Sequence, residues 1–155
     1  SKRFISSVER IANAGSGILL SGNPRTLDQA ETLMPVLEKL YGKENVLVVH
    51  LSIPAEETLK RNSKRYVCTS CGASPLVDLL KSTETCPICL GSLQKRKDDD
   101  PEIIKERLEQ YEERTKPVLA KIEEDGFTVF DIDGTKTPAE VHEAVMVAIE
   151  PSLNK

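Results

Sequence analysis

Short apolar runs alternate with amphipathic stretches along this 155-residue chain. Three of the runs are continuous, rich in β-branched or aliphatic residues, and bounded by glycine, proline or polar residues. That pattern is typical of strands in a sheet covered on both faces. The three predicted strands span residues 17–21, 46–53 and 127–132. Helical spacing of apolar residues dominates between them, so we predict the α/β fold class, with a parallel sheet and flanking helices.

Capping residues and helix breakers bound the predicted helices. A helix is expected from Thr26 or Asp28 to about Leu40. Three other helices are predicted over residues 1–14, 56–63 and 138–149. A longer helix follows Asp100, a good N-cap, and has Pro101 at its first position.

Two breakers lie in that longer helix. We expect Pro117 to kink it and Gly126 to end it, because proline lacks the N–H that a helix interior needs and glycine adopts the left-handed cap.

Length and charge exclude several classes of protein. The length suits one domain with a small insert. A net charge of -4 and a pI near 5.3 argue against a general nucleic-acid or membrane-surface binder, which needs a basic surplus. No apolar run approaches the roughly 20 residues of a membrane span, and none resembles a signal peptide. We therefore expect a soluble, cytoplasmic protein, and Ser1 at its start fits a chain that is processed or cut from a longer one.

Two C-x-x-C pairs, Cys68 with Cys71 and Cys86 with Cys89, carry the strongest local signal. Such pairs supply four soft ligands at tetrahedral geometry, which predicts a closed structural zinc site. A redox or disulfide role is the alternative, disfavoured by a cytoplasmic setting. Another metal is a further alternative.

Basic residues flank this cysteine insert, in an otherwise acidic chain. They are Lys60, Arg61, Lys64, Arg65, Lys95, Arg96, Lys97 and Arg107. They form either a solvated basic face or a flap whose guanidinium groups close over phosphates.

The run SGNPRTLDQ, residues 21–29, follows the first predicted strand and favours the second interpretation. It resembles the adenylate kinase family, whose corresponding run reads D-G-F-P-R-T with a glutamine four residues beyond the arginine. The resemblance continues through the cysteines, which match the zinc-bearing LID of many bacterial members, and through residues 96–99 and 133–136. It implies a P-loop-kinase-like core in two parts, residues 1–60 and 98–155, around a zinc LID at 61–97.

The resemblance also implies nucleotide-binding residues. Arg25 would hold the AMP phosphate and Gln29 its adenine. Arg61 would pack on the ATP base, with Gly134 and Lys136 in the loop beside it.

Three more arginines, Arg65, Arg96 and Arg107, match the family's catalytic residues. They would clamp the phosphates during transfer from ATP to AMP. Such catalysis rests on positioning, charge neutralisation and exclusion of water, all of which a closing flap supplies.

The P-loop of the family, G-x-x-x-x-G-K-S/T, has no match in this sequence, because the only Gly-Lys pair, Gly42-Lys43, precedes Glu44. The AMP-binding helical hairpin that follows it is also missing. Without the central P-loop strand, either the strands at 17–21 and 46–53 pair directly, or a missing segment or complementing chain fills the slot. We therefore predict that the chain alone is inactive.

Ser21 stands where the family has an aspartate that helps to place magnesium, which makes a magnesium site doubtful. A catalytically dead nucleotide-binding relative is therefore one alternative function. The other is a zinc-ribbon module that binds a protein or RNA. We interpret His50 and His142 as structural or solvent-facing, and residues 98–100 as the end of the LID and a helix cap.

Overall fold

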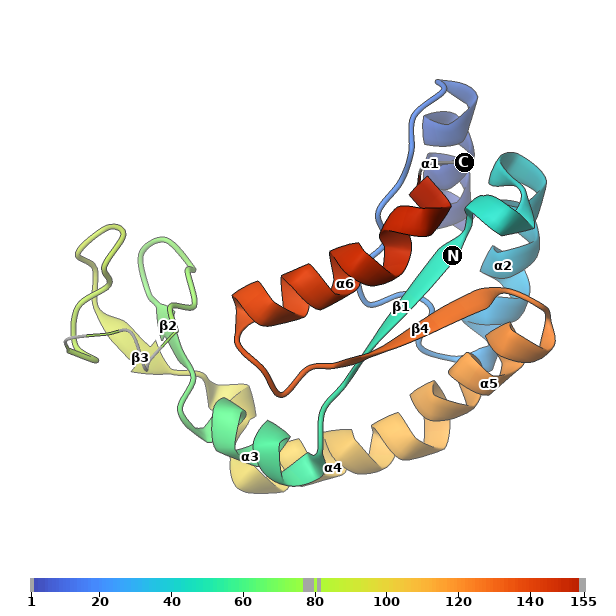
Figure 1. The fold of residues 1–155 in the computed structure, drawn as a ribbon. Helices are drawn as coiled ribbons and strands as arrows, with labels where there is room; N and C mark the ends of the chain where they lie inside the picture. Colours follow the sequence, from blue (N-terminus) through green and yellow to red (C-terminus); the bar gives the residue numbers. More distant parts are fainter. Residues whose placement is uncertain (1, 77–79, 81, 154–155) are drawn as a thin grey trace. The chain divides into compact units, whose positions relative to one another are not determined.

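The computed structural model describes residues 2–76, 80 and 82–153 (Figure 1). Ser1 of the predicted first helix and the side chain of Lys97 lie outside the described part. Within the chain, contacts define two compact units: Ser1–Ser52 with Gln110–Lys155, which we call the sheet unit, and Ile53–Glu109, which we call the cysteine unit.

The sheet unit is built on two parallel strands, β1 (Leu47–Ser52) and β4 (Thr128–Asp133). Their register runs from Leu47 opposite Thr128 to Ser52 opposite Asp133. Both strands were predicted from their apolar runs, and the α/β class with a parallel sheet is confirmed (Figure 1).

Helices flank this pair in the sheet unit. They are α1 (Lys2–Asn13), α2 (Leu27–Tyr41), α5 (Lys116–Glu124) and α6 (Pro138–Leu153), with a 3-10 turn η1 at Lys43–Asn45. The predicted cap of α2 is confirmed, since Thr26 Oγ1 accepts a hydrogen bond from the Gln29 amide at 3.4 Å. At α6, Thr137 and Glu140 form a reciprocal capping box.

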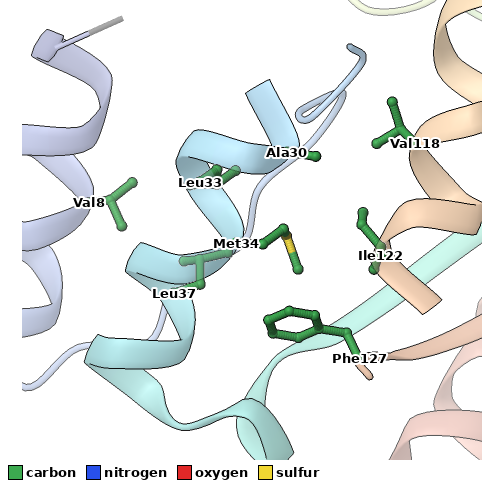
Figure 2. Packing of buried hydrophobic residues seen from close by; sticks show 8 residues of the cluster. All are labelled: Val8, Ala30, Leu33, Met34, Leu37, Val118, Ile122 and Phe127. Carbon is green, nitrogen blue, oxygen red and sulfur yellow. The ribbon is translucent and has the colours of Figure 1, made fainter. Parts of the chain in front are cut away.

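The buried core of the sheet unit lies between α1, α2, α5 and the start of β4 (Figure 2). Its members are Val8, Ala30, Leu33, Met34, Leu37, Val118, Ile122 and Phe127. Val48 of β1 and Val129 of β4 pack against this cluster. The sheet face that carries them therefore turns towards α2 and α5, and Phe130 and Ile132 of β4 lie on the other face.

The prediction of a strand at residues 17–21 is wrong, since none of residues 17–20 has regular structure and Ser21 is in a bend. A strand needs a hydrogen-bonded neighbour, and β1 pairs with β4 instead of with this segment. Ile18 and Leu20 pack on the core, whereas Leu19 is 94% exposed. The apolar pattern is real, but the described residues supply no partner strand.

The cysteine unit contains two short antiparallel strands, β2 (Tyr66–Cys68) and β3 (Leu93–Lys95). Helix α3 (Ala55–Ser63) precedes them, and the 3-10 turn η3 (Lys97–Asp99) and α4 (Pro101–Gln110) follow. Asp100 caps α4 as predicted, because its Oδ1 accepts from the Glu102 amide at 3.0 Å.

The long predicted helix is interrupted, in that a π-helical turn η4 (Tyr111–Thr115) separates α4 from α5. The irregularity lies just before Pro117, which cannot donate a backbone hydrogen bond to the preceding turn. Gly126 ends α5 with a φ of +83°, as predicted. Among the described helices, none combines the length and apolar character needed to cross a membrane.

Candidate functional site

The four cysteines of the cysteine unit converge. Their Sγ atoms all lie within 4.8 Å of one another, with Cys68 and Cys89 at 3.4 Å and Cys71 and Cys86 at 3.8 Å. Four thiolates at the usual zinc-sulfur length of about 2.3 Å lie about 3.8 Å apart in a tetrahedron. None of the four is in a disulfide. The cluster therefore fits one tetrahedral metal ion.

The backbone around the cysteines favours a thiolate. Amide hydrogen bonds, chiefly from Cys71 and then from Ser70, lower the pKa of the Cys68 thiol to about 6. The Gly91 amide also acts to lower the pKa of Cys89, but hydrogen bonding with Cys71 and Cys68 outweighs it and raises that pKa to about 12. The Cys68 thiol thus ionises readily, whereas ionisation of the Cys89 thiol beside it is disfavoured. A cation is therefore needed to hold four thiolates together.

Arg65, one of the predicted catalytic residues, directly precedes β2 and binds Asp99 through two hydrogen bonds. Its Nε donates to Asp99 Oδ2 at 2.8 Å and its Nη2 to Oδ1 at 2.5 Å. The Asp99 side chain is only 5% exposed, and Arg65 lowers its pKa. This two-point contact fixes the guanidinium plane in the cysteine unit.

Arg96 and Arg107 converge on the neighbouring carboxylate, Asp98. Arg96 Nη2 donates to Asp98 Oδ2 at 3.3 Å, and Arg107 Nη2 lies 3.8 Å from the same oxygen. Arg107 Nη1 also donates to the Asp98 carbonyl at 3.4 Å. All three side chains are about half exposed. The structure therefore brings the predicted arginine trio, Arg65, Arg96 and Arg107, to adjacent carboxylates of η3.

Arg61 does not join this trio through any described contact, since its Nε donates to Glu57 Oε1 at 2.7 Å within α3. The Arg61 side chain is 40% exposed. Arg61 and then, more weakly, Lys60 lower the pKa of Glu57. A stacking role for Arg61 stays a prediction.

In the sheet unit, Arg25 lies in the loop before α2 and is exposed. Its backbone amide donates to Gln29 Oε1 at 2.8 Å. Its guanidinium lies against Gly22, where a Cβ would come 2.4 Å from Nη2. No described acidic side chain forms an ion pair with Arg25, so its charge is available to an anion. Gln29 is bonded here through its carbonyl oxygen, and its predicted contact with a base is untested.

The loop after β4 holds the two remaining predicted binding residues, Gly134 and Lys136. The Gly134 amide donates to the Ser52 carbonyl at 2.8 Å, which ties this loop to the end of β1. Asp133 Oδ1 accepts from the amide and hydroxyl of Thr135 at 2.9 and 2.6 Å. The loop therefore lies at the carboxyl ends of both parallel strands, where ligands bind open α/β sheets.

A polar network that the sequence did not reveal lies on the sheet face towards α5. His50 Nδ1 is 3.1 Å from Asp131 Oδ1, and His50 Nε2 is 2.7 Å from the Tyr111 hydroxyl. The His50 and Tyr111 rings also stack, with centroids 6.3 Å apart. The β1-β4 register brings His50 opposite Asp131, and no local sequence pattern could have identified that partner.

Comparison with known proteins identifies consistent relatives. No family model matches the chain. It is 39% identical to a protein described as adenylate kinase from Citrifermentans bemidjiense over 145 residues, which are 91% of this chain and 67% of that protein. It is 38% identical over 136 residues to the adenylate kinase of Caldicellulosiruptor saccharolyticus, covering 86% of this chain and 62% of the relative.

A third relative, the adenylate kinase of Chlamydia pneumoniae, is 44% identical over 104 residues, which are 67% of this chain and 47% of that protein. The chain thus spans about half to two thirds of the length of the curated relatives it matches.

Proposed function

Because the chain belongs to the adenylate kinase family, we propose that it forms the larger part of an enzyme that converts ATP and AMP to two ADP. In this reaction an oxygen of the AMP phosphate forms a bond to the γ-phosphorus of ATP. The bond from that phosphorus to the β-phosphate oxygen breaks. The observation that carries the proposal is the convergence of Arg65, Arg96 and Arg107 on the adjacent carboxylates of η3.

Guanidinium groups suit the reaction because charge spreads over the phosphoryl oxygens in the transition state. The trio neutralises this charge, and Arg65 has the fixed orientation that electrostatic stabilisation requires. Asp98 carries one negative charge between Arg96 and Arg107, in the place that phosphate oxygens would take. Nucleotide phosphates would displace it.

The AMP side of the proposal rests on Arg25 and Gln29. Arg25 is exposed and has no described acidic partner, which suits an arginine that binds a phosphate. Gln29 in the first turn of α2 would bind the adenine, and its side chain accepts a hydrogen bond from the Arg25 amide. For ATP, we propose that Arg61, Gly134 and Lys136 lie beside the adenine.

Zinc is the metal we propose for the cysteine cluster, since four thiolates in a closed tetrahedron suit it best. The ion would stiffen residues 61–97 so that they move as one LID, while 1–60 and 98–155 form the core, in a cytoplasmic enzyme. Magnesium, when bound with the nucleotide, would neutralise phosphate charge. Ser21 offers magnesium only a neutral hydroxyl, so binding of the ion would depend mainly on the nucleotide phosphates.

We also propose that a further strand and helix carrying a P-loop complete the sheet. A two-stranded sheet is marginal by itself. β1 has only β4 as a described neighbour, and Val49 and Leu51 on its outer face are 36% and 49% exposed. Leu19 is 94% exposed on the segment that failed to form a strand. The added segment would precede Ser1 in the same polypeptide or belong to a complementing chain.

A coupled assay for ADP formation tests the proposal. We expect no turnover from the chain alone, and turnover once a P-loop segment of a relative is joined before Ser1. In that extended protein, Arg107→Ala and Arg25→Ala should abolish most activity, whereas Arg10→Ala, at an exposed arginine of α1, should not. Turnover that survives both arginine substitutions would contradict the proposed site.

The alternative of a catalytically dead, nucleotide-binding relative is favoured by Ser21. The same assay distinguishes it, since such a protein would bind AMP but stay inactive after the segment is joined.

The alternative of a zinc-ribbon interaction module has one observation in its favour. Ile88 within the second cysteine pair and Leu90 directly after it are 73% and 79% exposed, and Leu90 has an unfavourable φ of +61°. The zinc-ribbon alternative does not explain the exposed Arg25 without a described acidic partner, or the similarity to adenylate kinases. Absence of any AMP binding would favour it.

A further inference from the structure

The π-helical turn Tyr111–Thr115 links two parts of the sheet unit that are distant in sequence. At its first residue, the Tyr111 hydroxyl is 2.7 Å from His50 Nε2 on β1. At its last residue, Thr115 Oγ1 donates to the Arg25 carbonyl at 3.2 Å. The turn is closed by a hydrogen bond from the Lys116 amide to the Tyr111 carbonyl. One turn therefore contacts both the sheet and the loop before α2.

The sheet end of this connection is firmly held. His50 is bonded on both ring nitrogens, to Asp131 of the neighbouring strand and to Tyr111, and its ring stacks on the tyrosine at an interplanar angle of 11°. The His50 side chain is 21% exposed. Because β1 and β4 both contribute, the position of Tyr111 is set by the sheet.

The loop end restrains Arg25 from two sides. Its carbonyl accepts from Thr115, and its amide donates to Gln29. Its guanidinium lies over Gly22. The backbone of this exposed arginine is thus fixed, although no described acidic residue holds its charge.

We infer that Thr115 and Tyr111 are positioning residues for Arg25, through which the sheet sets where that guanidinium meets the phosphate of a nucleoside monophosphate. The part that concerns the phosphate rests on the proposed function. π turns interrupt helices at a cost in regular hydrogen bonding and often mark functional sites. This one places a hydroxyl on the Arg25 carbonyl, a contact that a continuous α-helix would shift.

Three variants test the contact. Thr115→Val removes the donor with little change of volume, Thr115→Ser retains it, and Thr128→Val makes the same exchange at an exposed residue of β4. Amide hydrogen exchange of residues 26–30 is measured without nucleotide. We expect faster exchange in Thr115→Val only. Equal exchange in all the proteins would overturn the inference.

Ligand binding then separates positioning from a general loss of structure. We expect Thr115→Val to weaken AMP binding by about 3- to 10-fold, the factor that one hydrogen bond is typically worth. The AMP affinity of Thr115→Ser should stay within about twofold of wild type. Inorganic tripolyphosphate is a probe of the arginine trio Arg65, Arg96 and Arg107, and its affinity should stay within about twofold of wild type in every variant. Tyr111→Phe, which keeps the ring but loses the hydroxyl, should act in the same direction as Thr115→Val.

The two proposals fail in different ways. If Arg25→Ala abolishes AMP binding but Thr115→Val leaves both AMP affinity and exchange unchanged, the positioning role is overturned and the proposed function stands. If Thr115→Val speeds exchange but the wild type binds no AMP, the restraint on Arg25 stands and the proposed function fails.

Discussion

The contact between Arg65 and Asp99 gives a measurable test of how the cysteine unit holds its arginines. The Asp99 side chain is 5% exposed and receives hydrogen bonds at 2.8 and 2.5 Å. Removing one partner of a buried ion pair costs about 3–5 kcal/mol. Arg65 is 32% exposed, so water replaces part of the lost interaction. For Asp99→Asn, which retains one acceptor oxygen, we expect a loss of about 2 kcal/mol in the free energy of unfolding.

A double-mutant cycle isolates this interaction. Urea unfolding at pH 7, with zinc in excess, is compared for wild type, Asp99→Asn, Arg65→Met and the double variant. We expect a coupling energy of about 1.5 kcal/mol. The pair of Lys60 and Glu57 in the same unit is the control, because the Lys60 side chain is 66% exposed and its contact with Glu57 is 3.4 Å long, and we expect a clearly smaller coupling there.

The pH dependence gives the same test a second readout. Because Arg65 lowers the pKa of Asp99, the ion pair stabilises fully above the ordinary carboxyl pKa of about 3.9 and is lost as the pH falls towards the lower folded value. Wild type and Asp99→Asn should therefore converge in stability below that pH. A coupling no larger than the control, or a difference that persists unchanged into acid, would refute this reasoning.

Three further predictions concern the binding groups. Asp98→Asn should tighten binding of inorganic tripolyphosphate by about threefold in calorimetric titration, because two arginines lose their shared exposed carboxylate; weaker binding would contradict the displacement of Asp98. Cys86→Ser should lower the zinc content after dialysis and abolish protection of the β2 and β3 amides from exchange, and full zinc retention would exclude a four-cysteine site. Gly22→Ala should weaken AMP binding at least about fivefold without loss of helical ellipticity, since a Cβ at φ +72° would come 2.4 Å from the Arg25 guanidinium; unchanged affinity would show that this contact is dispensable.

Much of the fold follows from local sequence signals. The strands at β1 and β4 were predictable because each is a short apolar run rich in β-branched and aliphatic residues and bounded by polar or turn-forming residues. Thr26 and Asp100 were identified as caps because a cap depends only on the next few residues. Residues 17–21 have the same apolar character but form no strand, because a strand also requires a neighbour whose presence no local pattern can report.

The candidate site also has features that the sequence predicts and features that only the folded structure shows. The cysteine spacing predicts a convergent cluster, since two pairs at this spacing can meet around one ion. The arginine roles came from the family resemblance, because the sequence alone gives only a basic region. Asp98 and Asp99 were interpreted as the end of the LID before a helix cap, and the pairing of Asp99 with the distant Arg65 depends on how β2 and β3 bring the chain together. His50 and Asp131 become partners only through strand register.

The most direct test of the central claim is a calorimetric titration of the whole chain with a bisubstrate analogue in which a chain of phosphates joins two adenosines. We expect saturable binding that is lost when Arg25 and Arg107 are both replaced by alanine and kept when Arg10 is replaced. If the wild-type chain shows no binding, or the double replacement binds as well as wild type, the proposed binding of nucleotide phosphates by these arginines is wrong.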